Sequence, residues 1–341
     1  MKTIALAFVA TLGLLSTSAV AQNLIANGSF ESPVVSPTGF TNFPVGSSTL
    51  TGWTVFGPSE TVVSIVGGSF AQLGVAFPAQ DGVQWLDLSG NGSNSTEGVQ
   101  QSVTTIAGRQ YQLSYSIGNT TGGGIFGTTG TVEVLVNGSV AFTDKNSAVN
   151  ATSLTWQQYS HAFVAAGSTT TIGFRNADPA TDENNSLDNV VLTEVPQAPT
   201  ITTLSPAPNP ATVNQTVVAT VTVSAALQPE ASGRVVGAAA VAAAIGGTAN
   251  VSGGGASCVA SLTNGVGSCT LVYATPGSYT LTAAYAGDAQ NAPSSGTAGL
   301  VVNAVTVTTA TVAAPTAANA MLVLLGSLLV IAGWRGLRGN R

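Results

Sequence analysis

The sequence predicts an all-β protein in which two antiparallel sandwiches follow one another along the chain. Outside its two ends the chain has almost no helical periodicity. Short stretches rich in Val, Thr, Tyr and Ser alternate in polarity and are broken by Gly, Asn and Pro, a pattern typical of strands and turns. Two prolines interrupt the pattern in residues 196–199. Because proline cannot donate to a sheet, they indicate a linker between two domains.

The composition excludes several classes of function. Of 341 residues, only 8 are Lys or Arg and 14 are Asp or Glu, which gives a net charge of −6. With so few Lys and Arg residues, the protein cannot form a basic surface that binds the phosphate backbone of a nucleic acid. We therefore expect no nucleic-acid partner. One His and two Cys are too few for an ordinary zinc site.

The N-terminal end is predicted to be a signal peptide that spans residues 1–21. Lys2 gives a positive start, residues 4–15 form an apolar run, and small residues lead up to Ala21. This order is that of a secretory signal, so we expect export and cleavage between Ala21 and Gln22. A short buried helix is the alternative.

Residues 22–195 are predicted to form the first sandwich. They carry 12 acidic against 3 basic residues, so this domain is acidic. Because the strand pattern recurs at short intervals, we expect antiparallel strands in two layers. The clearest strands are 61–66, 83–88, 110–117, 131–137, 169–175 and 186–194.

Residues 200–305 are predicted to form the second sandwich, and residues 306–315 an extended spacer. The clearest strands are 216–223, 248–252, 258–262, 267–273 and 278–285. Cys258 and Cys269 are the only cysteines, and they lie in this exported domain with ten residues between them, which suits one disulfide. A reactive thiol is the alternative, but it would need a nearby His, and His161 lies in the first domain.

Residues 316–341 are predicted to end the chain in a membrane. Residues 316–334 carry no charge, and this length is close to the ~20 residues that cross a bilayer core. Arg335, Arg338 and Arg341 follow directly, and an excess of Lys and Arg marks the cytoplasmic side. We therefore expect the C-terminus to stay inside and everything upstream to be exported. A buried helix of the last domain is the alternative.

Around Pro315 and Thr316 the tail resembles the IPTL-CTERM sorting signal of Gram-negative bacteria. The shared features are a Pro-Thr pair, a short spacer, an apolar helix and an Arg cluster at the C-terminus. The chain departs from that family at Ala314 and Ala317, where Ile or Val and Leu are usual. The resemblance implies an exosortase-like processing enzyme, insertion in the inner membrane during sorting, and a final place at the cell surface or in the extracellular matrix.

The first domain carries short motifs in a recognisable order. They lie at 23–31, 52–55, 81–88, 98–103, 108–115, 156–159 and 187–192. In this order they resemble the galactose-binding-like jelly roll shared by many carbohydrate-binding modules, and above all the bacterial choice-of-anchor C proteins and a related plant cell-wall DUF-type domain. The second domain resembles a bacterial Ig-like repeat through residues 206–213, 267–271 and 277–288.

The jelly-roll resemblance also implies a structural calcium ion. In related modules, the Glu of the opening motif and the Asp of the closing motif help to hold Ca²⁺, and Glu31 and Asp188 match those positions. Ca²⁺ takes several oxygen ligands, so two carboxylates that meet between the first and last strands suit it. In the alternative, Asp188 caps a turn and Glu31 is solvated.

Sugar binding depends on aromatic faces with polar groups beside them. Trp53 and Trp156 fall where the family fills its core, so we expect both to be buried. Trp85 is less expected in its strand, and Gln84 and Asp87 lie beside it. We therefore predict Trp85, Gln84 and Asp87 as ligand contacts.

No motif in the sequence predicts catalysis. His161 has no evident nucleophile or carboxylate partner, and nothing in the spacing of Asp81, Asp87 and Glu97 fixes a cleft. We therefore expect a protein that is not an enzyme and whose first domain binds an extracellular polysaccharide. A purely structural surface or matrix protein without a specific ligand is the alternative.

Overall fold

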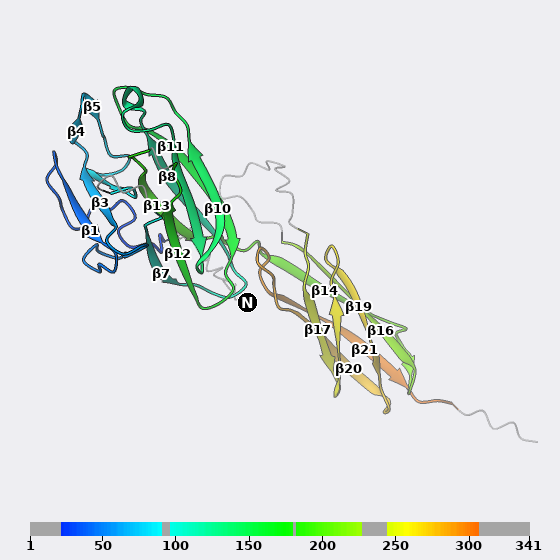
Figure 1. The fold of residues 1–341 in the computed structure, drawn as a ribbon. Helices are drawn as coiled ribbons and strands as arrows, with labels where there is room; N and C mark the ends of the chain where they lie inside the picture. The colour runs from blue at the N-terminus through cyan, green and yellow to red at the C-terminus, as the bar shows by residue number, and fades with distance from the viewer. Residues whose placement is uncertain (1–21, 91–95, 180–181, 227–243, 307–341) are drawn as a thin grey trace, which may run out of the picture.

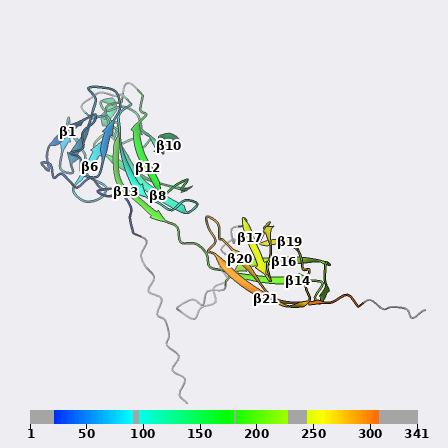
Figure 2. The same cartoon turned by 90° about the horizontal axis from the view of Figure 1, so that it is seen from below.

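The computed structural model describes residues 22–90, 96–179, 182–226 and 244–306. These residues form two β-sandwiches, one on each side of the segment that follows β13 (Figures 1 and 2). The all-β prediction is therefore confirmed. Within these ranges, no helix has the length and apolar character needed to cross a bilayer. The predicted signal peptide, 1–21, and the predicted membrane tail, 316–341, lie outside the described residues.

The first unit is a jelly-roll sandwich of a six-stranded and a five-stranded sheet, in which neighbouring strands are antiparallel. The six-stranded sheet contains, in order, β1 (Phe40–Pro44), β3 (Val62–Gly67), β6 (Gln84–Asp87), β13 (Ser186–Glu194), β8 (Gln110–Asn119) and β11 (Thr155–Val164). The five-stranded sheet contains β10 (Ser139–Asn146), β9 (Gly130–Val136), β12 (Thr169–Asn176), β7 (Gly98–Thr104) and β2 (Thr54–Phe56). Outside the two sheets lie β4 (Ala71–Gln72), β5 (Val75–Ala76) and the 3₁₀ turn η1 (Gly122–Gly124).

Alternation along the strands divides the apolar residues of the first unit between two clusters. On β3, Val63 and Ile65 join the core between the two sheets, while Val66 points to the opposite face. Successive side chains of a strand lie on opposite faces, so the outer face of the six-stranded sheet has an apolar cluster of its own. This outer cluster consists of Val66, Val75, Phe77, Trp85, Phe126 and Leu154.

The second unit is a smaller sandwich with a separate core. One sheet contains, in order, β14 (Thr200–Ala207), β16 (Thr216–Ala225) and β19 (Val266–Val272). The other contains β15 (Ala211–Thr212), β21 (Ser294–Asn303), β20 (Gly277–Tyr285), β17 (Thr248–Gly253) and β18 (Ala256–Ser261), with β15 and β21 parallel.

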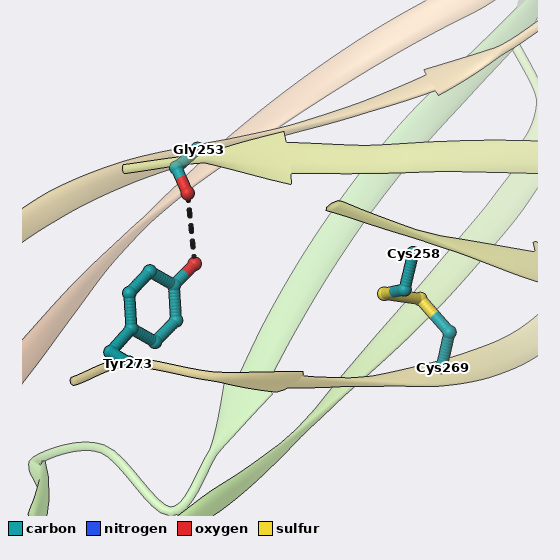
Figure 3. The surroundings of a disulfide bond; sticks show 4 residues. All are labelled: Gly253, Cys258, Cys269 and Tyr273. Atoms are coloured by element: carbon teal, nitrogen blue, oxygen red, sulfur yellow. Dashed lines mark hydrogen bonds between the residues drawn. A yellow bond between two sulfur atoms is a disulfide. The ribbon is translucent and has the colours of Figure 1, made fainter. Parts of the chain in front are cut away.

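The two cysteines join the two sheets of the second unit. Cys258 on β18 is bonded to Cys269 on β19, with a Cα–Cα distance of 5.8 Å (Figure 3). The predicted disulfide is confirmed. Both strands are edge strands of their sheets, so the bond closes one open side of the sandwich. Beside it, the Tyr273 hydroxyl donates to the carbonyl of Gly253 at the end of β17, at 3.1 Å.

A turn of the second unit holds the segment between the sandwiches. Gln197 donates its side-chain amide to the carbonyl of Asp288, and the Ala198 amide donates to the carbonyl of Gln290 at 2.7 Å. The Asp288 carboxylate organises this turn by accepting from the backbone amides of Gln290 and Asn291 at 2.9 and 2.7 Å. The residues that follow β13 are thus bonded to the second sandwich.

Candidate functional site

A cavity of about 190 Å³ lies on the outer face of the six-stranded sheet. Its floor comes from β1, β3 and β6, and the β4–β5 hairpin contributes to its wall. Rings from strands and loops surround it: Phe40, Phe70, Phe77, Trp85 and Phe126. Polar groups reach it from Ser64, Gln72, Asp87, Glu183 and Asn184.

Two tryptophans of the six-stranded sheet bind residues 77–78, which we call the covering segment. The Trp85 indole donates to the carbonyl of Phe77 at 3.1 Å, and the Trp156 indole donates to the carbonyl of Pro78 at 2.9 Å. The two indoles meet edge to face, with ring centroids 6.1 Å apart. Trp85 is only 1 % exposed as a result, so its ring forms part of the base of the cavity.

The polar groups of the cavity include an acceptor and a donor that are otherwise unused. Oδ1 of Asp87 accepts from the amide and hydroxyl of Ser89 at 3.0 and 2.7 Å, and from the amide of Asn185 at 3.3 Å. Oδ2 of Asp87 and the side-chain amide nitrogen of Asn184 have no hydrogen-bond partner among the described residues. Burial raises the pKa of Asp87 to about 7 against the opposing effect of these bonds.

The predicted ligand contacts are not all brought together. Trp85 and Asp87 line the cavity, but Gln84 does not, because strand alternation turns it to the other face of β6. Its side chain is 1 % exposed. Its amide nitrogen donates to, and its oxygen accepts from, backbone groups of Phe30, Pro33 and Val35. Gln84 therefore holds the N-terminal segment against the sandwich.

Glu31 and Asp188, from the two ends of the domain, bind different parts of the same loop, residues 80–84. Asp188 Oδ2 accepts from the amides of Gln80 and Asp81, both at 2.9 Å, and Oδ1 accepts from its neighbour Asn189 at 2.7 Å. Burial raises the pKa of Asp188 to about 7.

From the other side, Glu31 Oε1 accepts from the amides of Val83 and Gln84 at 2.8 and 3.0 Å. Three of the four carboxylate oxygens of Glu31 and Asp188 thus already accept hydrogen bonds from backbone N–H groups. The two carboxylates are therefore better placed to hold loop 80–84 than to coordinate a cation. In the described part of the chain, no three His, Cys, Asp or Glu side chains are arranged to hold a metal. Calcium at Glu31 and Asp188 stays a prediction.

One polar cluster has no signal in the sequence. Asp144 Oδ2 accepts from the Tyr115 hydroxyl and lies 2.6 Å from His161 Nε2. Phe142 stacks on the His161 ring with centroids 4.1 Å apart. His161 thus has a carboxylate partner that its neighbours in the sequence do not reveal. Asp144 on β10 is 17 positions from His161 on β11 and 29 positions from Tyr115 on β8, and only the fold brings these strands together. The cluster ties an edge strand of one sheet to the other sheet.

Comparison with known proteins assigns the first unit to a family. A family profile described as "Protein of unknown function (DUF642)" matches residues 23–193. The chain belongs to the DUF642 family. The match ends one residue before the end of β13, and all residues that line the cavity lie within it. Among curated proteins, none matches the chain.

Solved structures similar to the chain include carbohydrate-binding modules. One is TmCBM61 in complex with beta-1,4-galactotriose, at 13 % identity over 51 % of this chain and 100 % of that one, with a TM-score of 0.30. Another is the CBM22-1 xylan-binding domain from Paenibacillus barcinonensis Xyn10C, at 19 % identity over 47 % and 94 %, with a TM-score of 0.27. A third, described as "CBM4 structure and function", has 15 % identity over 50 % and 99 %, with a TM-score of 0.27.

Proposed function

We propose that the DUF642 domain binds a neutral saccharide, without catalysis, in the cavity on its outer face. The observation that carries the proposal is that aromatic walls lie beside an acceptor, Asp87 Oδ2, and a donor, the Asn184 amide, neither of which has a hydrogen-bond partner among the described residues. Sugar rings present apolar C–H faces that suit aromatic side chains. Their hydroxyls both donate and accept hydrogen bonds, so a donor and an acceptor beside the rings can orient them.

The size of the cavity and the charge of the domain limit the class of saccharide that the site can bind. Pockets for drug-sized ligands usually measure about 300–1,000 Å³. A cavity of about 190 Å³ suits a single sugar unit, such as the end or a branch of a polysaccharide. The domain has 12 acidic and 3 basic residues, so its field disfavours polyanionic chains. We therefore favour a neutral glycan.

We further propose that this domain is displayed outside a Gram-negative cell. The support is in the sequence alone: a signal peptide at 1–21, an Ig-like spacer at 200–305, and an IPTL-CTERM tail around Pro315 and Thr316. In this proposal an exosortase-like enzyme processes the tail. The protein then resides at the cell surface or in the extracellular matrix, where polysaccharide is its partner.

Calorimetric titration with neutral mono- and oligosaccharides, with and without calcium, tests saccharide binding. Phe40 borders the cavity and is 48 % exposed, so Phe40→Ala removes a wall without opening a core. We expect affinity to fall about 5- to 10-fold, since a lost aromatic contact costs about 1 kcal/mol.

Ile106→Ala removes an exposed apolar side chain outside the cavity and should leave affinity unchanged. No heat with any neutral glycan would favour a purely structural protein instead. Binding that Phe40→Ala leaves intact would place the saccharide elsewhere.

A further inference from the structure

Four acidic residues of the first unit lie close enough together for their charges to interact, and one of them, Asp87, lines the cavity. Glu97 and Asp182 are completely buried, Asp87 is 8 % exposed, and Asp178 is partly buried. The charges of Asp87 and Asp182 act on Asp178, and the charge of Glu97 acts on Asp87, so the four carboxyl groups share one region. We call these four residues the inner carboxylates.

No Lys or Arg side chain is paired with Asp87 or Asp178 among the described residues. Residues 22–195 contain only three Lys or Arg residues. Arg175 pairs with Glu133, and Arg109 lies 3.5 Å from Glu194. The third, Lys145, is exposed on β10. Buried carboxylates normally have a paired cation or coordinate a metal, and for Asp87 and Asp178 no such cation is found in the described part of the chain.

Two buried oxygens beside the inner carboxylates have no hydrogen-bond donor. They are Oδ2 of Asp178 and Oδ1 of Asn185, and Asn185 is completely buried. The Asn185 amide nitrogen donates to the carbonyl of Thr131 and to Oδ1 of Asn176, both at 2.6 Å. Because both of these partners are acceptors, the orientation of the amide is settled, and the unpartnered atom is an oxygen.

The side chains of Asp178 and Asn185 are held by the same two residues, Thr131 and Asn176. Oδ1 of Asp178 accepts from the Thr131 amide at 2.5 Å, while Asn185 donates to the Thr131 carbonyl. The Asp178 amide donates to Oδ1 of Asn176 at 3.1 Å, the same atom that Asn185 contacts. Asp178 and Asn185 therefore lie side by side. Asp178 is held through Oδ1 and Asn185 through its amide nitrogen, and each keeps one oxygen without a hydrogen-bond partner.

We propose that a calcium ion binds here, coordinated by Oδ2 of Asp178 and Oδ1 of Asn185. Ca²⁺ accepts carboxylate and amide oxygens together and completes its shell with backbone carbonyls and water. Its charge would balance the carboxylates of Asp178 and Asp87. Only one of the two side-chain ligands is acidic, which agrees with the absence of a three-residue His, Cys, Asp or Glu group among the described residues. The site is separate from Glu31 and Asp188.

Calcium titration of the full chain, stripped with EDTA and free of saccharide, tests the site. For the wild type we expect one Ca²⁺ per chain by calorimetry. At calcium about 100-fold above Kd, the Tm of the first unit should rise by about 5–10 °C. Asp178→Asn keeps an acceptor for the Thr131 amide but loses the anionic ligand. It should abolish both responses while its Tm in EDTA stays close to that of the wild type, because the hydrogen bond from the Thr131 amide is kept.

Glu31→Gln is the matched control, since it neutralises a carboxylate of the same domain that holds loop 80–84. It should keep the calcium response. Loss of the response in Glu31→Gln with retention in Asp178→Asn would overturn the proposal, as would a wild type without calcium binding.

Hydrogen exchange on the wild type provides a test that depends on no variant. Calcium should slow exchange at the amides of residues 176–178 and 182–185. Slowing confined to residues 80–84 would overturn the proposal. Because saccharide is absent from both experiments, their outcome is independent of the proposed sugar binding.

Discussion

Gly82 shows how one residue lets two carboxylates hold a loop. Its φ is +70°, a left-handed conformation that glycine adopts at little cost. A Cβ built on it would lie 2.3 Å from Oε1 of Glu31, the atom that accepts from the Val83 and Gln84 amides. A side chain at this position would therefore have two effects: it would strain the backbone, and it would displace the Glu31 carboxylate.

Gly82→Ala should destabilise the first unit by about 3 kcal/mol. The left-handed backbone costs an alanine about 1–2 kcal/mol, and loss of hydrogen bonds to a charged group costs about as much again. Gly108→Ala is the control, because its φ is +79° and nothing lies within 4 Å of a Cβ there. Thermal unfolding should show a Tm loss about two to three times larger for Gly82→Ala. Equal losses would mean that the Glu31 contact contributes nothing.

The sequence of β6 already indicates that Gln84 lies apart from the other two predicted ligand contacts. Trp85 and Asp87 are separated by one residue, so a strand places them on one face and Gln84 on the other. The sequence did not predict which aromatic residues surround the cavity. Phe70, Phe77 and Phe126 come from segments outside regular alternation, and only the folded chain brings them over Trp85. The inner carboxylates were likewise hidden, because Asp87 and Asp178 are 91 positions apart.

At the scale of elements, alternation predicts strands that have one buried face. The predicted strand 186–194 is observed as β13 with the same bounds, and 169–175 is observed as β12, Thr169–Asn176. Edge strands such as β1 and β10 are mostly exposed on both faces, so burial imposes no alternation on their sequences. They were not among the stretches that the pattern singled out.

The disulfide between β18 and β19 should stabilise the second unit only. Replacing both Cys258 and Cys269 by Ser should lower its free energy of unfolding by up to about 3 kcal/mol, the value for closing a loop of this length. In scanning calorimetry the transition of the first unit should be unchanged, which makes it an internal control. Wild-type protein in excess reductant should unfold like the double variant. A shift of both transitions would contradict separate units.

The Asp288 turn should make the second unit acid-sensitive. Burial raises the pKa of Asp288, but hydrogen bonds from Asn291, Gln290 and Tyr285 outweigh it, so the pKa is lowered overall. A carboxyl whose pKa is lower in the folded state stabilises the fold above the unfolded value of 3.8. That contribution disappears as pH falls through the lowered folded pKa.

Asp288→Asn should therefore cost about 1–2 kcal/mol at pH 7, a figure that allows for the partial exposure of the carboxylate. The difference from the wild type should shrink toward zero as the pH falls below 3.8. Denaturant unfolding of the second unit across this range provides the measurement. If the difference in the free energy of unfolding between Asp288→Asn and the wild type were the same at every pH, ionisation of Asp288 would not be the source of the stabilisation.

At the scale of the whole molecule, the two sandwiches have separate apolar cores. The bonds of Gln197 and Ala198 to the Asp288 turn attach the connecting segment to the second unit. The sequence predicted two domains and their strand-rich character because these depend on local patterns. It could not predict which residues the connection contacts, because those bonds join residues about 90 positions apart.

The attachment of the covering segment through indole N–H groups gives the protein an optical probe of its own cavity. Three of its four tryptophans lie in the first unit, and two of these, Trp85 and Trp156, donate to the carbonyls of Phe77 and Pro78. Buried indoles emit at shorter wavelengths than solvated ones. If residues 77–78 moved away from the sheet, or if a ligand bound among the aromatic rings, the wavelength of the intrinsic tryptophan emission would therefore change. No added label would be needed to detect it.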